Sequence, residues 1–233
     1  MKNIILTFIL CLGYLCTLAK SPNALLSSQS MDGGLNPIAL YGEIGDIGEI
    51  RNIEDPDFEW TQYKEKDCSA VIGKYGLMIE SKKDNGIVGS TTEVSINPEV
   101  DSFTFGMMLT GKVAKDKGIG LLFDYANNKN YKCIMFTKDH FVYYTVEGGE
   151  KSIVKQGLIK TGKDGLLLPI ITRKHGQTIV YLNGQEVTKL KNFKFTEPVF
   201  GVAVQGKNKV ICSNFIFNIL TDNNESETST TGN

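Results

Sequence analysis

The sequence predicts an all-β protein, folded as an antiparallel sandwich or barrel. Between residues 101 and 220, short segments rich in aromatic and β-branched residues follow one another closely, with turn residues between them and almost no helical period. Within this region Asn183-Gly184 separates two β-rich runs, which is a strong short-range signal for a hairpin. Evenly spaced short strands of this kind are typical of sandwiches and barrels.

The expected strands can be placed in order along the chain. Phe58-Glu59-Trp60 is the first, and residues 75–80 form the second. Residues 91–96 alternate in polarity and stop at residues 97–98, an Asn-Pro pair. The later expected strands are residues 103–109, 120–124, 131–136, 141–146, 178–182, 185–187, 199–204 and 210–217.

Turn residues separate these strands. Residues 127–130 are rich in asparagine, residues 138–139 form a two-residue link, and residues 147–150 carry two glycines in another hairpin loop. Asn183 and Gly184 both tolerate positive φ, which favours a type I′ turn. We therefore interpret Asn183 and Gly184 as structural and not as part of a site.

Both ends of the chain are expected to lie outside the domain. Residues 1–19 have a basic start, an apolar run and small residues at the end, which predicts a signal peptide cleaved after Ala19. A membrane anchor is the alternative, but the apolar run is short for a span of roughly 20 residues. Residues 20–56 are expected to be an extended leader that partly docks on the domain, residues 57–220 the domain, and residues 221–233 a disordered polar tail.

Charge and cysteine content exclude some classes of protein. The chain has 25 basic and 26 acidic residues, and loss of residues 1–19 removes Lys2 alone among them, so the net charge becomes −2. This balance argues against nucleic-acid or anionic-membrane partners, and no membrane span is expected after signal removal. Cleavage leaves Cys68, Cys133 and Cys212. Buried free thiols are the simplest interpretation, and a Cys68–Cys212 disulfide is the alternative.

The order of these segments resembles a known family. The segments that carry the resemblance are residues 118–136 (GIGLLFDYANNKNYKCIMF), 176–187 (GQTIVYLNGQEV), 200–204 (FGVAV) and 213–217 (SNFIF). Together they resemble the concanavalin A-like, laminin-G-like jelly-roll domains of exported bacterial proteins, over residues 57–220. Ser213 stands where many relatives have aspartate, and Lys132 where a second aromatic residue is usual. The resemblance implies a two-sheet antiparallel jelly-roll sandwich and, more loosely, carbohydrate or cell-surface binding.

Catalysis by a glycosidase of this fold needs two carboxylates that face one cleft. The densest acidic cluster is residues 54–59, but Pro56 interrupts it and it lies at the expected edge of the domain. Asp124 ends a central strand and has no acidic partner two positions away. We therefore assign no catalytic residue and leave enzymatic activity undecided, with the expectation leaning against it.

The sequence also contains few candidate metal sites. His140 and His175 both lie in or next to turns without a set of partner ligands, so neither a zinc site nor a Cys–His nucleophile is expected. Calcium remains open, because Asp124 with Asn127 and Asn130 could form a rim of oxygen ligands. Asparagine-rich turns also occur for backbone reasons alone. No other cofactor is expected.

Aromatic side chains carry the remaining functional signal, because a sugar ring can lie on an aromatic face. Tyr125, Tyr143, Tyr144 and Trp60 are the candidates, with the amide of Asn127 beside them. Tyr143 and Tyr144 are adjacent, so one is expected to point outward from the strand. Strand aromatics also commonly fill the core, and this alternative applies to all four.

These observations lead to one preferred function. We expect an exported, non-catalytic carbohydrate-binding or adhesive domain whose partner is a glycan or cell-surface component. The protein would then be periplasmic, bound to the cell surface or secreted. The alternatives are a glycoside hydrolase of the same fold and a structural protein-interaction module.

Overall fold

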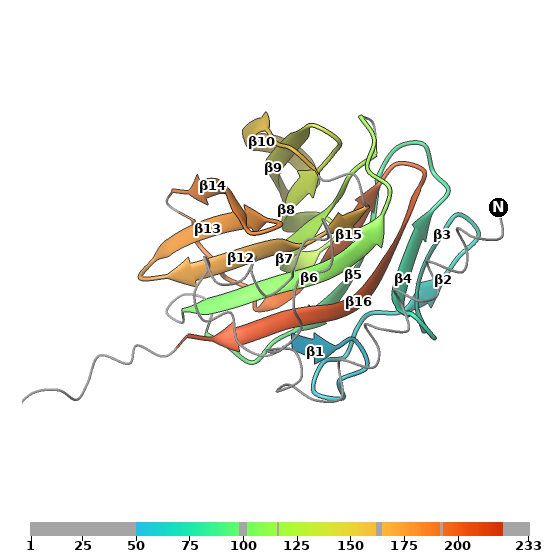
Figure 1. Ribbon diagram of the computed structural model, residues 1–233, viewed down its shortest axis with the longest axis horizontal. Coiled ribbons are helices and arrows are strands. Elements are labelled where there is room, and N and C mark those ends of the chain that lie inside the picture. Colours follow the sequence, from blue (N-terminus) through green and yellow to red (C-terminus); the bar gives the residue numbers. More distant parts are fainter. Residues whose placement is uncertain (1–49, 98–101, 116, 162–164, 192, 221–233) are drawn as a thin grey trace, which may run out of the picture. The chain divides into compact units, whose positions relative to one another are not determined.

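The computed structural model describes residues 50–97, 102–115, 117–161, 165–191 and 193–220, which form two antiparallel sheets (Figure 1). The first sheet contains β1 (Ile50–Asn52), β2 (Tyr63–Lys64), β3 (Cys68–Gly73), β4 (Gly76–Ser81), β6 (Phe103–Gly111), β11 (Leu166–Leu167), β12 (Pro169–Lys174), β13 (Gln177–Leu182), β14 (Gln185–Leu190) and β16 (Asn208–Ile219). The second contains β5 (Ile87–Glu93), β7 (Ile119–Asn127), β8 (Asn130–Phe136), β9 (His140–Glu147), β10 (Glu150–Leu158) and β15 (Val199–Gln205).

Strand order explains how distant segments meet. The first sheet runs β14–β13–β12–β6–β16–β4–β3–β2, with β1 beside β16 and β11 beside β6. The second sheet runs β10–β9–β8–β7–β15–β5. Neighbours such as β6 and β16, or β15 and β5, are far apart in sequence. This two-sheet antiparallel arrangement confirms the predicted jelly-roll sandwich.

The core lies between the two sheets. Phe103 and Phe105 of β6 contact Phe200 of β15 across the interface, with ring centroids 5.3 and 4.8 Å apart. All three rings are fully buried. Inward-facing residues of both sheets thus form one continuous apolar layer, as the period-two pattern predicts.

The second sheet is also apolar on its other face. Leu122, Cys133, Met135 and Tyr144 form a separate buried cluster there, together with Val146 and Ala203. Strands β7, β8 and β9 therefore bury residues on both faces. This explains why residues 120–124 and 131–136 are nearly continuous apolar runs instead of clean alternations.

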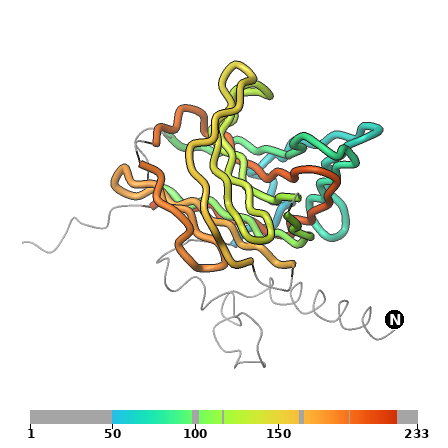
Figure 2. Tube along the Cα trace, turned by 90° about the horizontal axis from the view of Figure 1, so that it is seen from above, coloured from blue at the N-terminus to red at the C-terminus, as the bar shows by residue number. Residues whose placement is uncertain are grey.

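Several hairpin turns use residues in the left-handed region, among them the β13–β14 and β9–β10 turns. Asn183 and Gly184 have φ of 51° and 80°, which confirms the predicted turn between β13 and β14. The Asn183 side chain also accepts a hydrogen bond from the backbone N–H of Leu168 at 2.8 Å. The β9–β10 turn contains Gly148 and Gly149, also with positive φ, and projects from the body of the domain (yellow in Figure 2).

Some expectations differ from the structure. Residues 58–60 are not a strand, because Pro56 and a series of side-chain-bonded turns precede them and Trp60 turns into the core. Residues 50–52, expected in the leader, form β1. The signal peptide, most of the leader and the tail lie outside the described residues.

The three cysteines of the domain are reduced in the structure. Cys68, Cys133 and Cys212 are all buried free thiols, so the alternative Cys68–Cys212 disulfide is wrong for this structure. The Sγ atoms of Cys68 and Cys212 donate to Glu65 Oε2 and Asn214 O at 3.4 and 3.3 Å. In the part of the chain that the structure describes, no helix is long and apolar enough to cross a membrane.

Candidate functional site

Residues 53–62, here called the edge segment, connect β1 to β2 and run along the end strand of the second sheet. The backbone N–H of Thr61 donates to the carbonyl oxygen of Thr91 in β5 at 2.8 Å. Ser90 Oγ donates to the carbonyl oxygen of Thr61 at 2.7 Å, and the two threonine hydroxyls lie 3.3 Å apart. Because β5 ends the sheet, the edge segment supplies partners to a strand edge that would otherwise be open.

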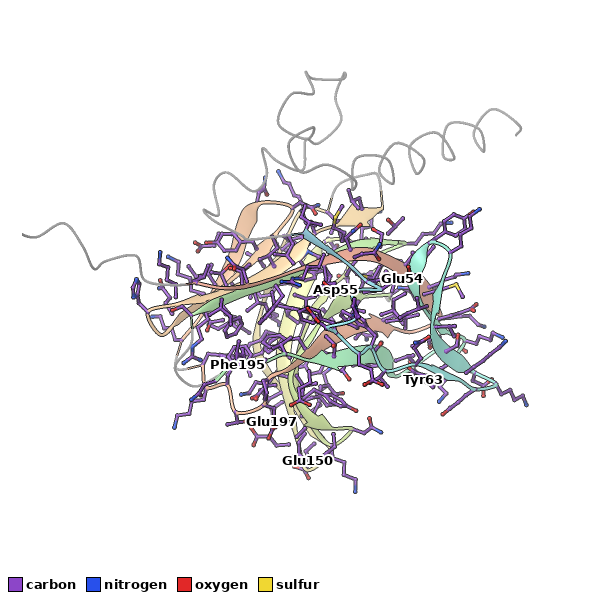
Figure 3. All side chains as sticks on the ribbon, turned by 90° about the horizontal axis from the view of Figure 1, so that it is seen from below. Glu54, Asp55, Tyr63, Glu150, Phe195 and Glu197 are labelled. Carbon is purple, nitrogen blue, oxygen red and sulfur yellow. The ribbon has the colours of Figure 1, made fainter. Side chains whose placement is uncertain are left out.

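Short polar side chains shape the first half of the edge segment. Asn52 Oδ1 accepts from the backbone N–H of Glu54, and Asp55 Oδ1 accepts from that of Asp57, both at 3.0 Å. The other carboxylate oxygen of Asp55 binds Arg51 Nη1 at 3.0 Å. Asp55 is therefore committed to the local turn, whereas its neighbour Glu54 is exposed at the same bend (Figure 3).

Aromatic rings anchor the second half of the edge segment to the first sheet. Phe58 and Trp60 both meet Phe215 of β16 edge-on, with ring centroids 4.8 and 5.6 Å apart. Trp60 is only 3% exposed, and its Nε1 is buried without a hydrogen-bond partner. Trp60 therefore fills the core and leaves one donor unused.

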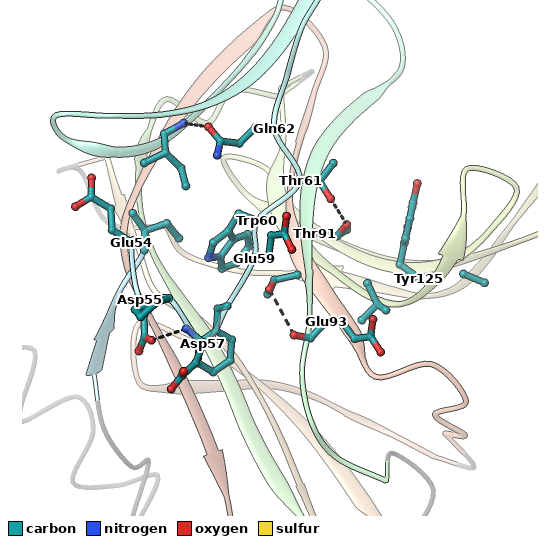
Figure 4. Close-up of a pocket in the computed structure, with 17 residues that line it drawn as sticks. Glu54, Asp55, Asp57, Glu59, Trp60, Thr61, Gln62, Thr91, Glu93 and Tyr125 are labelled. Atoms are coloured by element: carbon teal, nitrogen blue, oxygen red, sulfur yellow. Dashed lines mark hydrogen bonds between the residues drawn. The ribbon is translucent and has the colours of Figure 1, made fainter.

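An open groove of about 1090 Å³ lies beside the edge segment (Figure 4). The edge segment forms one wall of the groove, and residues at the ends of β3, β5, β7 and β15 complete it. The residues that line it are Ile53, Glu54, Asp55, Pro56, Asp57, Phe58, Glu59, Trp60, Thr61, Gln62, Ile72, Thr91, Thr92, Glu93, Tyr125, Ala126 and Val199. Chain segments distant in sequence thus meet in one concave surface, which is where ligands commonly bind.

Four carboxylates in the groove are available to a ligand. Glu54, Asp57, Glu59 and Glu93 are all exposed, and none makes a hydrogen bond or ion pair with a side chain among the described residues. Hydroxyl and amide groups, including that of Gln62, line the same groove. The groove therefore presents many hydrogen-bond acceptors, which suits a ligand rich in hydroxyl or ammonium donors.

Tyr125 forms the aromatic end of the groove and joins it to the outer face of the second sheet. Its ring is half-buried, and its hydroxyl donates to Asn128 Oδ1 at 2.6 Å. Burial raises the pKa of the Tyr125 phenol. Its ring centroid lies 6.0 Å from that of Tyr131, which in turn lies 6.4 Å from that of Tyr144. A row of three tyrosines on β7, β8 and β9 therefore leads away from the groove.

The carboxylate of Asp124, an expected calcium ligand, already has protein partners. Oδ1 accepts from the backbone N–H groups of Thr196 and Glu197, both at 2.7 Å, and from the Thr196 hydroxyl at 2.9 Å. Oδ2 pairs with the ammonium of Lys132. Burial acts to raise the pKa of Asp124, but the hydrogen bonds from Lys132 and the two amides outweigh it and lower the pKa.

The asparagines of the same expected calcium rim are likewise engaged. Asn127 Oδ1 accepts from the backbone N–H of Lys129 at 2.9 Å and from Asn130 Nδ2 at 3.1 Å. Asn130 Oδ1 accepts from the backbone N–H of Gly148 at 3.0 Å. Among the described residues no group of three His, Cys, Asp or Glu side chains could hold a metal ion. The oxygens expected to bind Ca²⁺ thus accept protein hydrogen bonds in this structure.

The other expected aromatic contacts are buried. Tyr143 is 4% exposed and stacks on Phe123 in the core, with centroids 5.9 Å apart. Tyr144 is on the opposite face, as the adjacency predicted, but it is 1% exposed and Lys151 Nζ lies 3.8 Å from its ring centroid. Of the four candidate aromatics, Tyr125 and the wall residue Trp60 are the two that line the groove.

Sequence reasoning missed Glu93 and Thr91 as site residues and set aside the acidic cluster at residues 54–59. The cluster was placed at the domain edge, which is correct, but the edge is where the groove lies. Glu93 is opposite Val199 in the register between β5 and β15, and β15 also pairs with β7, which carries Tyr125. Strand order, which is not visible in a single sequence, brings these residues together.

Comparison with known proteins supports the fold. No protein-family model and no curated protein sequence matches the chain. Among solved structures, the β-glucanase of Bacillus licheniformis aligns with a TM-score of 0.51 at 5% identity, covering 73% of this chain and 97% of that one. A protein of unknown function with a galectin-like fold from Bacillus subtilis aligns with a TM-score of 0.50 at 9% identity, covering 73% and 94%.

The exoplasmic/lumenal domain of VIP36, in its Ca²⁺/Man3GlcNAc-bound form, aligns with a TM-score of 0.50 at 9% identity, covering 77% of this chain and 89% of that one. At such identities the likeness is one of fold. The chain thus has the jelly-roll sandwich fold of the concanavalin A-like and galectin-like domains, as its sequence pattern predicted.

Proposed function

We propose that the protein is an exported, non-catalytic carbohydrate-binding or adhesive domain and that its glycan ligand occupies the groove beside the edge segment. The observation that carries this proposal is the composition of the groove. It combines four exposed carboxylates without side-chain partners, threonine and glutamine side chains, a buried indole N–H without a partner and the half-buried ring of Tyr125. Sugar hydroxyls both donate and accept hydrogen bonds, and sugar C–H groups pack on aromatic faces, so this set of groups suits a glycan.

The fold alone does not distinguish binding from cleavage. Structural neighbours include a β-glucanase and a domain solved with Man3GlcNAc. The choice must therefore come from the side chains of the site.

The exposure of the groove carboxylates favours binding without catalysis. A glycosidase needs one carboxyl that stays protonated to act as a general acid, and burial in an apolar pocket is the usual way to achieve this. Glu54, Asp57, Glu59 and Glu93 are exposed. Asp124, the buried acidic residue among those described, is held ionised by its hydrogen bonds.

An open groove with exposed groups predicts modest affinity. We expect dissociation constants between millimolar and micromolar, about −4 to −8 kcal/mol. The chain contains one tryptophan, Trp60, which lines the groove, so its intrinsic fluorescence should report occupancy directly.

A glycan array followed by fluorescence titration tests the proposal. We expect at least one glycan to bind and to change the Trp60 emission. Tyr125→Ala should weaken that binding about tenfold or more, whereas Tyr75→Ala, which removes an exposed tyrosine outside the groove, should leave it unchanged. Circular dichroism would check that both variants fold.

An array without any bound glycan, or equal affinity of the Tyr125 variant and the wild type, would refute the proposal. Release of shorter sugars during the titration would favour the glycoside hydrolase instead.

The proposed export rests on residues 1–19. Expression of the chain with residues 1–19 in place, followed by amino-terminal sequencing of the exported product, should find Lys20 as the first residue. An uncleaved product retained in the membrane would contradict the proposed signal peptide.

A further inference from the structure

We propose that the groove selects oligosaccharides of amino sugars that carry free, protonated amino groups over the same sugars in neutral form. The inference rests on the proposed function and adds the chemical class of the ligand. It follows from the charge of the groove and from the unused donor of Trp60.

The groove is strongly acidic although the chain as a whole is not. Five of its lining residues are Asp or Glu, and none is Lys, Arg or His. The net charge of the entire chain is only −1. Arg51 pairs with Asp55, and this leaves the four other carboxylates without a described cation. A ligand that brings positive charge would relieve this imbalance, and a neutral one would not.

The carboxylates do not form a metal site. No three of them, or of any other described acidic or metal-binding side chains, gather closely enough to hold an ion. Glu54 and Asp57 are in the first half of the edge segment, Glu59 follows, and Glu93 is at the end of β5. The negative charge is thus distributed along the groove, which fits a chain-like ligand with repeated positive groups better than a single cation.

Trp60 supplies an independent requirement. Trp60 is only 3% exposed, and its Nε1 has no hydrogen-bond partner. It also lines the groove. In Figure 4 the ring nitrogen lies on the side of the indole that faces the Glu54 end of the groove. An indole N–H only donates, so it needs an acceptor oxygen from the ligand. Simple metal ions and polyamines offer no such oxygen, whereas an amino sugar carries both ammonium and hydroxyl groups.

The expected selectivity can be scaled from exposed ion pairs. One such pair contributes about 0.2–1 kcal/mol, equivalent to about 1.4- to fivefold in affinity. Two or three pairs along an oligosaccharide should together give about tenfold. Because the carboxylates are exposed, salt should screen most of this advantage.

Two tetrasaccharides with the same sugar backbone, one with free amino groups and one with neutral acetamido groups, provide the test. The glucosamine tetramer and the N-acetylglucosamine tetramer would be titrated into the full chain at low and high salt, with Trp60 fluorescence and calorimetry as readouts. We expect the glucosamine tetramer to bind about tenfold more tightly at low salt, and the difference to shrink at high salt. The double variant Glu59→Gln/Glu93→Gln removes two of the four carboxylates and should reduce the difference to about threefold or less. Glu150→Gln is the matched control, because Glu150 is exposed on β10 and lies away from Glu54 and Asp55 (Figure 3), and it should leave the preference unchanged.

The outcomes separate the two proposals. Equal affinity for both tetramers overturns the charge selectivity and leaves glycan binding intact. Binding of neither tetramer also overturns the selectivity, and the glycan array then decides whether the proposed function survives. If spermine or a lysine tetrapeptide displaces the glucosamine tetramer at equal concentration, the groove is a general cation-binding surface and the inference fails.

Discussion

Replacing Asp124 by asparagine should show how strongly one buried carboxylate holds the segment between β14 and β15 to the second sheet. Asp124 has φ of 53°, and asparagine tolerates this left-handed conformation. The substitution therefore removes the charge without forcing a new backbone geometry. Its carboxylate has three donors from Thr196 and Glu197 on one oxygen and the Lys132 ammonium on the other.

The expected cost follows from these contacts. A hydrogen bond to a charged group contributes about 1.5–3 kcal/mol and a neutral one about 0.5–1.5, so three weakened bonds on Oδ1 lose about 2–3 kcal/mol. The asparagine amide also places a donor against the Lys132 ammonium, whose side chain is 19% exposed and can recover only part of its hydration. We expect a total loss of about 3–4 kcal/mol, which corresponds to a fall in Tm of about 10 °C for a domain of this size.

Urea denaturation of a double-mutant cycle measures the ionic part separately. Lys132→Met keeps an apolar stem near the ring of Phe193, over which the Lys132 Nζ lies at 4.8 Å from the centroid. We expect Asp124→Asn and Lys132→Met to show a coupling free energy of about 2 kcal/mol. A coupling below about 0.5 kcal/mol, the value of an ordinary exposed pair, would refute the reasoning that this pair is a buried clamp.

Acidity provides a second readout on the same residue. The pKa of Asp124 is lower in the folded protein than its ordinary value of 3.8, because its hydrogen bonds outweigh the effect of burial. A carboxylate with a depressed folded pKa adds stability above its unfolded pKa and loses it as the pH falls through the folded pKa. The stability gap between wild type and Asp124→Asn should therefore be constant near neutrality and close below about pH 3.8. A gap that widens in acid would contradict this sign.

Three further substitutions or measurements test the packing. Gly120→Ala should cost at least about 3 kcal/mol in urea denaturation, because the new Cβ would lie 1.9 Å from the carbonyl oxygen of Ile134. Gly118→Ala is the control: its nearest contact is 3.4 Å, so it should change stability by less than about 0.5 kcal/mol in the same assay. Gly184→Ala should cost about 1–2 kcal/mol, because φ of 80° is unfavourable for alanine, and an unchanged midpoint would argue against the observed turn. Burial raises the pKa of Cys133 to about 12, so at pH 8 iodoacetamide should label this thiol only after unfolding, as measured by mass spectrometry. Rapid labelling of the native protein would show that the buried cluster around Leu122, Cys133 and Tyr144 is open to solvent.

Most of the fold was predictable because local patterns agree with its long-range contacts. Strand period, the Asn183-Gly184 turn and the order of apolar runs all indicate a two-layer β protein before any contact is known. Phe58 and Trp60 were misassigned to a strand because aromatic residues favour strands on average. The local turns before them decide otherwise, and their rings pack on Phe215 without a ladder of backbone hydrogen bonds.

The candidate site was less predictable for a different reason. A sequence shows which residues are acidic or aromatic but not which strand lies at the end of a sheet. Tyr143 and Tyr144 were reasonable candidates from their adjacency, yet both are covered, one by the core and the other by Lys151 and its neighbours. Asp124 was named as a possible calcium ligand, and in the structure its carboxylate holds the segment between β14 and β15 through Thr196 and Glu197.

The two ends of the second sheet show why the groove is found where it is. At one end, β10 is exposed along most of its length, with Ile153 and Val154 more than half exposed and a register shift between Ile153 and Lys155 that distorts its edge. Lysine side chains and a bulge are common ways to keep such an edge from pairing with another chain.

At the other end, β5 is covered by the edge segment, which binds through Thr61 and has little regular structure of its own. Because that segment is fixed by the buried ring of Trp60, the half-buried ring of Phe58 and side-chain-bonded turns, its remaining side chains need not serve the fold. Carboxylates can therefore collect there at little cost to stability, and a solvent-facing acidic wall beside Tyr125 is what remains for a ligand.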